Sequence, residues 1–153
     1  MICYRLAKAR YMDSLDGFGA ALRGGRWNGV GVKVVYTASS RALAMAEMLV
    51  HLDMEDVPDD YHIMSIEVPD DVGRHTISPD QLPVHWNKMI EFLRLTKSMG
   101  NDFIRDKKYG VLIVPSAVVK GDVNILINPA HPSFSKIKII GTEPFPFDHR
   151  LFC

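Results

Sequence analysis

The alternation of apolar and polar residues along the chain predicts a series of short strands. Met64, Ile66 and Val68 occupy every second position of residues 61–68, as expected for a strand with one buried face, and Pro69 ends that strand. Apolar and β-branched runs predict five further strands, of which the third is fully buried and the last two are partners in the same sheet. These strands are expected at residues 2–7, 32–36, 111–114, 123–127 and 137–140.

Helical patterns separate these strands. A helix is expected over residues 41–54, because Ser40 stands before it and can cap its first turn. A second helix is expected over residues 86–106, either continuous or interrupted near Gly100. Residues 12–31 are rich in glycine and are expected to be largely irregular. The chain is therefore predicted to be an α+β protein whose strands gather towards its C-terminal half.

The composition is that of one compact domain spanning residues 1–153. Hydrophobic residues make up 47% of the chain and charged residues 24%, which is near the average for a soluble domain. Lysine plus arginine number 18 and aspartate plus glutamate number 18, so the formal net charge is zero. No global field therefore favours nucleic acid or an anionic membrane, and any anion has to be bound by a few local groups.

Cysteines and histidines give no indication of a disulfide framework or a metal site. Cys3 and Cys153 lie at opposite ends of the chain without a CxxC motif, and the six histidines fall in no metal-ligand spacing. The N-terminus lacks the apolar core of a signal peptide, and no apolar run approaches the roughly 20 residues of a membrane helix. We therefore expect a soluble cytoplasmic protein without a bound metal.

Glu47 is the one polar residue among residues 42–50 of the predicted helix. At about 100° per residue it shares a helix face with Leu43, Val50 and Met54, so its carboxylate is expected to be withdrawn from water. A carboxylate in that position needs a cationic or hydrogen-bonding partner, or the wall of a polar cleft. His51, one turn later, could supply a hydrogen bond. The alternative is a glutamate at the helix edge that reaches water.

Other residues could meet an anionic or planar ligand. Arg26 and Trp27 lie among glycines, which let a backbone approach a ligand closely, and an arginine fork matches phosphate oxygens. The alternative there is a surface turn with a packed tryptophan. Ser116 directly follows a predicted strand, where functional loops often lie, but it could equally serve only the backbone of a turn. Tyr36 is either a core residue or a ring offered to a planar ligand.

Six segments, taken together in their order and spacing, resemble the RES-domain toxins of RES–Xre toxin–antitoxin modules, a family named for an arginine, a glutamate and a serine. The resemblance covers essentially the whole chain. One departure lies at residues 100–103, where many relatives are expected to carry a tryptophan. The six segments are Gly-Gly-Arg-Trp-Asn (24–28), Val-Val-Tyr-Thr-Ala (34–38), Ala-Glu-Met-Leu-Val-His (46–51), Val-Pro-Ser-Ala (114–117), 124–132 and 147–152.

This resemblance implies an ADP-ribosyltransferase-like fold, in which short mixed or antiparallel sheets and flanking helices form a cleft for NAD. The implied activity is cleavage of the nicotinamide–ribose bond, which depletes cellular NAD and arrests growth. The implied partner is a helix-turn-helix antitoxin of the Xre type, which covers the active site in a hetero-oligomeric complex and binds operator DNA. The toxin itself then needs neither nucleic acid nor a membrane, in agreement with its neutral charge.

The residues and the resemblance together suggest a role for each candidate. Nicotinamide leaves NAD as a neutral molecule, so one carboxylate suffices where other glycosidic bonds need two. We expect Glu47 to bind the ribose hydroxyls and stabilise the oxocarbenium-like transition state, and Arg26 to clamp a phosphate. The family motif implies that Tyr36 orients the nicotinamide end and that Ser116 binds substrate and positions Arg26 or Glu47. The remaining candidates for binding NAD are Trp27, Asn128 and Arg5.

Two alternative functions remain open. One is transfer of ADP-ribose to a protein or small acceptor, because residue spacing does not encode whether water, phosphate or a side chain meets the sugar. The other is a non-catalytic domain that only binds a partner. The combination of Arg26, Tyr36, Glu47 and Ser116 argues against the second alternative, since a binding module has no need for a carboxylate within an apolar helix.

Overall fold

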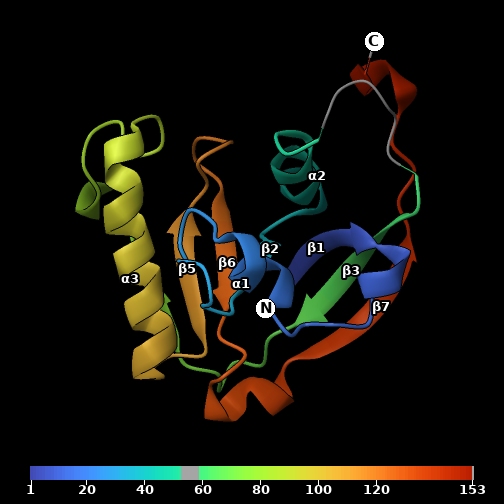
Figure 1. Cartoon of the computed structure of the whole chain (residues 1–153). Coiled ribbons are helices and arrows are strands. Elements are labelled where there is room, and N and C mark those ends of the chain that lie inside the picture. Colours follow the sequence, from blue (N-terminus) through green and yellow to red (C-terminus); the bar gives the residue numbers. More distant parts are fainter. Residues whose placement is uncertain (53–58, 153) are drawn as a thin grey trace.

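The computed structural model describes residues 1–52 and 59–152, which form a mixed β-sheet flanked by helices (Figure 1). This arrangement confirms the predicted α+β class. The helices are α1 (Phe18–Arg23), α2 (Arg41–Leu49) and α3 (Leu93–Asp106). The strands are β1 (Ile2–Lys8), β2 (Val35–Ala38), β3 (Tyr61–Glu67), β4 (Arg74–Thr76), β5 (Val111–Pro115), β6 (Val123–Ile127) and β7 (Lys138–Pro144).

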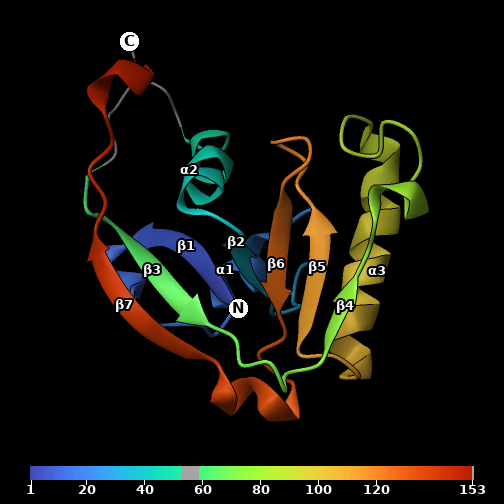
Figure 2. The same cartoon turned by 180° about the vertical axis from the view of Figure 1, so that it is seen from behind.

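Among the described residues, seven strands form the sheet in the order β4-β5-β6-β2-β1-β3-β7. The β4–β5 pair is parallel, and the other neighbours are antiparallel. β7 pairs with β3 and not with β6, so the prediction that residues 137–140 pair with residues 123–127 is wrong. The helical turn Pro132–Lys136 carries the chain from β6 to the far edge of the sheet (Figure 2). Apolar content alone cannot specify such a crossover.

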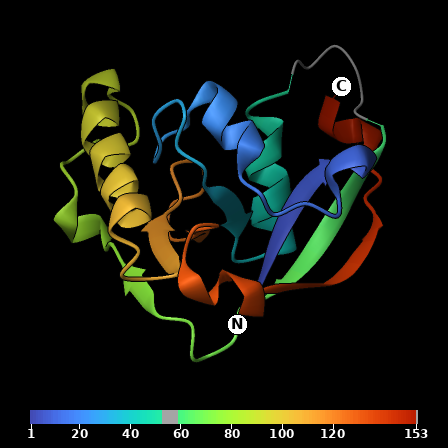
Figure 3. The ribbon, with the colours of Figure 1, turned by 60° about the horizontal axis from the view of Figure 1, so that its bottom comes forward.

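The helices pack on different parts of the sheet. α3 lies along β4 and β5, and its Phe103 packs in one cluster with Leu112 of β5. α2 packs through Leu43 in a second cluster with Leu6 of β1 and Ile63 of β3. Figure 3 shows α1 and α2 in the space between α3 on one side and β1, β3 and β7 on the other. The site described below lies in this central space.

Several boundaries differ from the predicted ones. α1 forms within residues 12–31, which the glycine content marks as irregular. β4 has no apolar alternation and is not predicted at all. α3 begins at Leu93, directly after the short 3-10 helix Ile90–Phe92, and Trp86 lies in a turn and packs into the core. α2 ends at Leu49. The predicted helix end at Met54 and the second cysteine, Cys153, lie outside the described residues.

Gly100 does not break α3 but allows its close approach to the loop before β2. A Cβ at this position would lie 2.7 Å from the carbonyl carbon of Trp27 and 3.1 Å from the Cβ of the same residue. One turn earlier, the hydroxyl of Thr96 donates a 2.7 Å hydrogen bond to the carbonyl of Arg26. α3 therefore braces residues 24–29, the loop that carries Arg26.

Candidate active site

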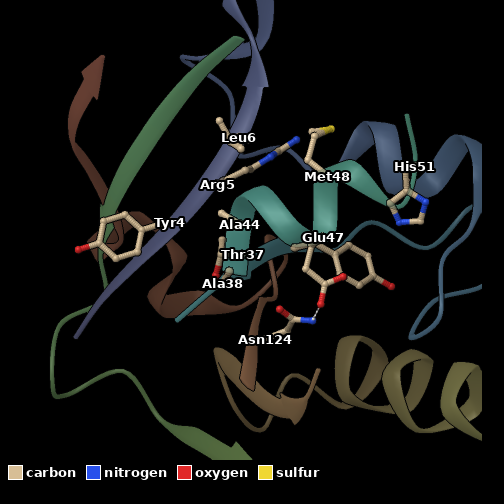
Figure 4. A pocket seen from close by; sticks show the side chains of 11 residues that line it. Tyr4, Arg5, Leu6, Thr37, Ala38, Ala44, Glu47, Met48, His51 and Asn124 are labelled. Atoms are coloured by element: carbon tan, nitrogen blue, oxygen red, sulfur yellow. Dashed lines mark hydrogen bonds between the residues drawn. The ribbon is translucent and has the colours of Figure 1, made fainter. Parts of the chain in front are cut away.

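A cavity of about 200 Å³ lies beside α2, between that helix and the strands β1, β2 and β6 (Figure 4). It brings together three of the predicted site residues, namely Arg5, Tyr36 and Glu47. Figure 4 shows the carboxylate of Glu47 directed at Asn124. The residues that line the cavity are Tyr4, Arg5, Leu6, Tyr36, Thr37, Ala38, Ala44, Glu47, Met48, His51 and Asn124.

Helix α2 places Glu47 at this cavity. The hydroxyl of Ser40 accepts a 3.0 Å hydrogen bond from the backbone N–H of Leu43, which is the predicted N-cap. Leu43 is buried and fixes the helix against the sheet, whereas Val50 is 58% exposed. The prediction of an apolar face that includes Val50 is therefore wrong. Glu47 is half-buried, and its carboxylate lies where the core meets the cavity.

Two donors converge on one oxygen of that carboxylate. The hydroxyl of Ser116 donates to Oε1 of Glu47 at 2.8 Å, and Nδ2 of Asn124 donates to the same oxygen at 2.6 Å. The Ser116 hydroxyl also accepts hydrogen bonds from the backbone N–H groups of Val118 and Val119, at 3.1 and 3.0 Å. Its own hydrogen is therefore left for Glu47. Both partners donate to Oε1, which leaves Oε2 for other contacts.

Asn124 is a site residue that sequence reasoning missed as an individual candidate. In β6 it pairs with Val114 of β5 on one side and with Ala38 of β2 on the other. Ser116 follows β5 directly, so the β5–β6 register places Asn124 beside Ser116. The sequence signal that could have identified Asn124 is the pairing of the two predicted strands at 111–114 and 123–127 as a hairpin.

Tyr36 lines the cavity while its hydroxyl is engaged elsewhere. The hydroxyl donates to Oδ1 of Asn28 at 2.8 Å and accepts from the backbone N–H of Trp27 at 3.0 Å. Burial raises the pKa of Tyr36 to about 12, although the hydrogen bond from Trp27 and the positive charge of Arg26 oppose the rise. The phenol therefore stays neutral at physiological pH, and the ring is the part available to a ligand.

Arg5 reaches the cavity from β1. Burial lowers the pKa of its guanidinium, and the opposite charge of Asp16 counteracts that effect. Among the described residues, its side chain donates to the carbonyl of Ser14, at 3.4 Å. A partly desolvated guanidinium with so few acceptors is a favourable site for an anionic group.

Arg26 stands outside the cavity wall. Its Nη2 donates to the carbonyl of Asn87 at 3.3 Å, and its guanidinium carbon lies 5.6 Å from the centroid of the Trp86 ring. Its charge nevertheless acts on the hydroxyl of Tyr36. Arg26 is thus close to the cavity without lining it.

Trp27 and Asn128 are held in the core. Trp27 is 2% exposed, and its ring centroid lies 5.8 Å from that of Trp86. Asn128 is fully buried, its Nδ2 donates to the carbonyl of Ile104 at 3.1 Å, and its Oδ1 accepts from the N–H of Ala130 at 2.9 Å. These contacts join α3 and the loop after β6 to the sheet, and neither side chain lines the cavity.

The histidines form no recognisable metal centre in the described part of the chain. His51 lines the cavity one turn after Glu47, but among the described contacts no hydrogen bond joins the two side chains. Across residues 1–52 and 59–152, no three histidine, cysteine, aspartate or glutamate side chains gather where they could hold a metal ion. Within the same ranges, no helix has the length and apolar character to cross a membrane.

Known proteins share this sequence pattern over nearly its whole length. Residues 2–148 match the RES domain. The chain is 40% identical over 147 residues to the Prs ADP-ribosylating toxin of Sphingobium sp. (strain YBL2), covering 95% of this chain and 91% of that protein. It is 41% identical over 157 residues to Toxin Res of Pseudomonas putida, covering 99% of this chain and 100% of that protein.

A solved structure shares the fold. The M. tuberculosis MbcT–MbcA toxin–antitoxin complex matches with a TM-score of 0.71 over 99% of this chain and 86% of that chain, at 20% identity. So low an identity supports the fold alone. The family match and the two relatives confirm the resemblance seen in the six sequence segments: the chain belongs to the RES domain family.

Proposed function

We propose that this RES-domain protein is the toxin of a toxin–antitoxin module and cleaves the nicotinamide–ribose bond of NAD in the cytoplasm. The observation that carries the proposal is the carboxylate of Glu47, held by Ser116 and Asn124 beside a cavity that Arg5 also lines. A fixed carboxylate matches the positive charge that develops on the ribose, and a partly buried guanidinium matches the pyrophosphate. The names of the Sphingobium and Pseudomonas relatives support the role as a toxin.

The proposed reaction depends mainly on the placement of charge. When the bond between C1′ of the ribose and N1 of the ring breaks, nicotinamide takes the electron pair and leaves as a neutral molecule. The ribose becomes an oxocarbenium ion. Oε2 of Glu47 would bind a ribose hydroxyl and face this cation, an effect of the kind worth ~10²–10³ in rate. Water then adds to C1′ and releases a proton, which gives ADP-ribose.

The cavity suits one end of the dinucleotide. Its volume of about 200 Å³ is below the ~300–1,000 Å³ of pockets that enclose a whole ligand. We place the nicotinamide ribose in the cavity with its ring against Tyr36, and the pyrophosphate towards Arg5. The outer phosphate and the adenosine would then lie towards Arg26. If Arg26→Ala alters the thermal stability but not the KM for NAD, this role of Arg26 is wrong.

The proposal is tested by incubating the purified protein with NAD and identifying the products by mass spectrometry. The wild-type protein is expected to release nicotinamide. Glu47→Gln keeps the shape of the side chain and removes its charge, so it should abolish release without changing the far-UV spectrum. Glu67→Gln is the matched control, because Glu67 is exposed at the end of β3 and its loss should leave turnover unchanged. Undiminished release by Glu47→Gln would remove Glu47 from the mechanism.

A second candidate function is transfer of ADP-ribose to a protein. The name of the Sphingobium relative, an ADP-ribosylating toxin, favours it. The first bond broken is the same, and a protein side chain takes the place of water at C1′. Intact-mass spectra of a lysate incubated with the toxin and NAD distinguish the two reactions. Modified proteins indicate transfer, whereas free ADP-ribose without modified proteins indicates hydrolysis.

We further propose that an antitoxin of the Xre type covers the cavity in a hetero-oligomeric complex. The structural relative, which is a toxin–antitoxin complex, supports a partner of this kind. An exposed apolar side chain beside the site also supports it: Val118, two residues after Ser116, is 38% exposed, and its backbone N–H donates to the Ser116 hydroxyl. A purified complex with the antitoxin is expected to release no nicotinamide. A complex as active as the free chain would contradict this proposal.

A further inference from the structure

Asn124 stands out among the cavity residues because its backbone and its side chain are both constrained. β6 lies between β5 and β2, so the backbone of Asn124 is paired on both sides. Its Nδ2 donates to Glu47, while its Oδ1 is buried and meets no donor among the described residues. A buried acceptor without a donor destabilises the fold. Such a group calls for an explanation, and a role in function is one.

The Asn124 side chain serves Glu47 as a hydrogen-bond donor, through its amide N–H group. Rotating the amide would bring Oδ1 against Oε1 of Glu47 with no proton between the two oxygens, so Nδ2 has to face the carboxylate. Ser116 donates to the same oxygen. Two donors therefore engage Oε1 and orient the carboxylate so that Oε2 is the oxygen available to a ligand.

The other polar groups around the cavity do not set this orientation. Arg5 approaches from β1, His51 follows on α2, and the Tyr36 hydroxyl is bonded elsewhere. Among the described contacts, none of these three side chains forms a hydrogen bond with Glu47. The orientation of the carboxylate therefore depends on Asn124 and Ser116.

We propose that Asn124 is a positioning residue for Glu47. It fixes which carboxylate oxygen faces the cavity and does not itself bind NAD. The inference rests on the proposed function, because its kinetic consequence appears only in a reaction that uses Glu47. Strand β6 would then contribute to catalysis through Asn124, which acts only on Glu47 of α2.

Two substitutions of Asn124 show whether its side chain acts as a hydrogen-bond donor or only fills space. Asn124→Ala removes the donor, and we expect kcat for NAD consumption to fall about tenfold or more while KM stays within about twofold. Asn124→Asp keeps the shape but sets an acceptor against the carboxylate, so it should be at least as damaging as Asn124→Ala. A role in shape alone predicts the opposite order. Circular dichroism checks that both variants are folded.

Asn101→Asp is the matched control for the change from amide to carboxylate. Oδ1 of Asn101 accepts a 2.9 Å hydrogen bond from the N–H of Gly29, and an aspartate keeps that acceptor. Asn101 lies on α3, does not line the cavity and, among the described contacts, forms no hydrogen bond with Glu47. We expect its kcat to stay within about twofold of wild type.

Binding measured in a Glu47→Gln background separates positioning of the carboxylate from direct contact with the substrate. In the Glu47→Gln background, adding Asn124→Ala should leave the Kd for NAD unchanged by calorimetry, because Asn124 acts through the carboxylate. Weaker binding in the double variant would overturn the inference. So would an Asn124→Ala variant with wild-type kcat, or an Asn124→Asp variant that is more active than Asn124→Ala.

A measurement without turnover keeps this inference distinct from the proposed function. In ¹⁵N-labelled protein, the side-chain amide resonances of Asn124 are expected to shift clearly between wild type and Glu47→Ala. Unshifted resonances would overturn the contact and the inference with it. If the wild-type protein leaves NAD intact, the proposed function fails, while the amide resonances still decide whether Asn124 holds Glu47.

Discussion

Replacing Gly100 by alanine should separate α3 from the loop that carries Arg26. The new Cβ would lie 2.7 Å from the carbonyl carbon of Trp27, whereas ordinary contacts begin at 3.4 Å. The carbonyl oxygen of Trp27 lies nearer still and would overlap the new Cβ. The helix and the loop would therefore have to move apart by more than the roughly 0.7 Å that the carbonyl carbon alone requires, and overpacking of this kind costs roughly 1–3 kcal/mol. Backbone lies on both sides of the contact, which favours the upper end of that range. The gain in helix propensity, about 1 kcal/mol, leaves a net loss near 2 kcal/mol.

Thermal unfolding followed by circular dichroism measures this effect. For a chain of this length, a loss near 2 kcal/mol corresponds to a fall in Tm of roughly 4–8 °C. Gly19→Ala is the control, because Gly19 lies in α1 and a Cβ there meets no atom within 4 Å, so its Tm should stay the same or rise slightly. A Gly100→Ala variant as stable as wild type would refute the tight contact between α3 and the loop.

Further predictions concern the capping serine, the buried phenol and the cavity arginine. Ser40→Ala removes the N-cap of α2 and should cost about 1 kcal/mol in the free energy of unfolding, measured by urea titration; an unchanged midpoint would contradict the role of the cap. Because folding raises the pKa of Tyr36 from its ordinary value to about 12, the folded state holds that proton more tightly. The resulting stabilisation is complete below pH 10 and is lost as the pH rises towards 12. Urea titrations across this window should therefore show a smaller loss in Tyr36→Phe than in wild type, and equal losses would contradict the assignment. Arg5→Lys keeps the charge but loses the planar fork, so the KM for NAD should rise about tenfold, and an unchanged KM would place the pyrophosphate elsewhere.

A strand was predictable where apolar and polar residues alternate along it or where the whole strand is apolar. Met64, Ile66 and Val68 are each completely buried, as their alternation predicts. β4 could not be found in this way, because Arg74–Thr76 is a short edge strand whose residues are largely exposed. The partner of β7 could not be found either, because pairing with β3 depends on how the chain crosses the sheet. Local residue patterns do not carry that information.

The candidate site was predictable to the extent that one helix residue broke an apolar pattern. Glu47 has polar partners beside a cavity, as a carboxylate withdrawn from water requires. Asn124 was missed because it becomes visible only once β5 and β6 are placed in register. Trp27 and Asn128 carry polar or aromatic groups that suit a ligand, but their contacts within the core use those groups. Residue type alone cannot separate these two uses.

Whether Glu47 cleaves NAD is tested most directly by the nicotinamide released per NAD consumed, measured side by side for the wild-type chain and for Glu47→Gln. We expect one nicotinamide for each NAD lost in the wild-type reaction, and none above the enzyme-free blank with the variant. Folded wild-type protein that leaves NAD intact, or a variant that matches the wild-type rate, would contradict the claim that the carboxylate held by Ser116 and Asn124 cleaves NAD.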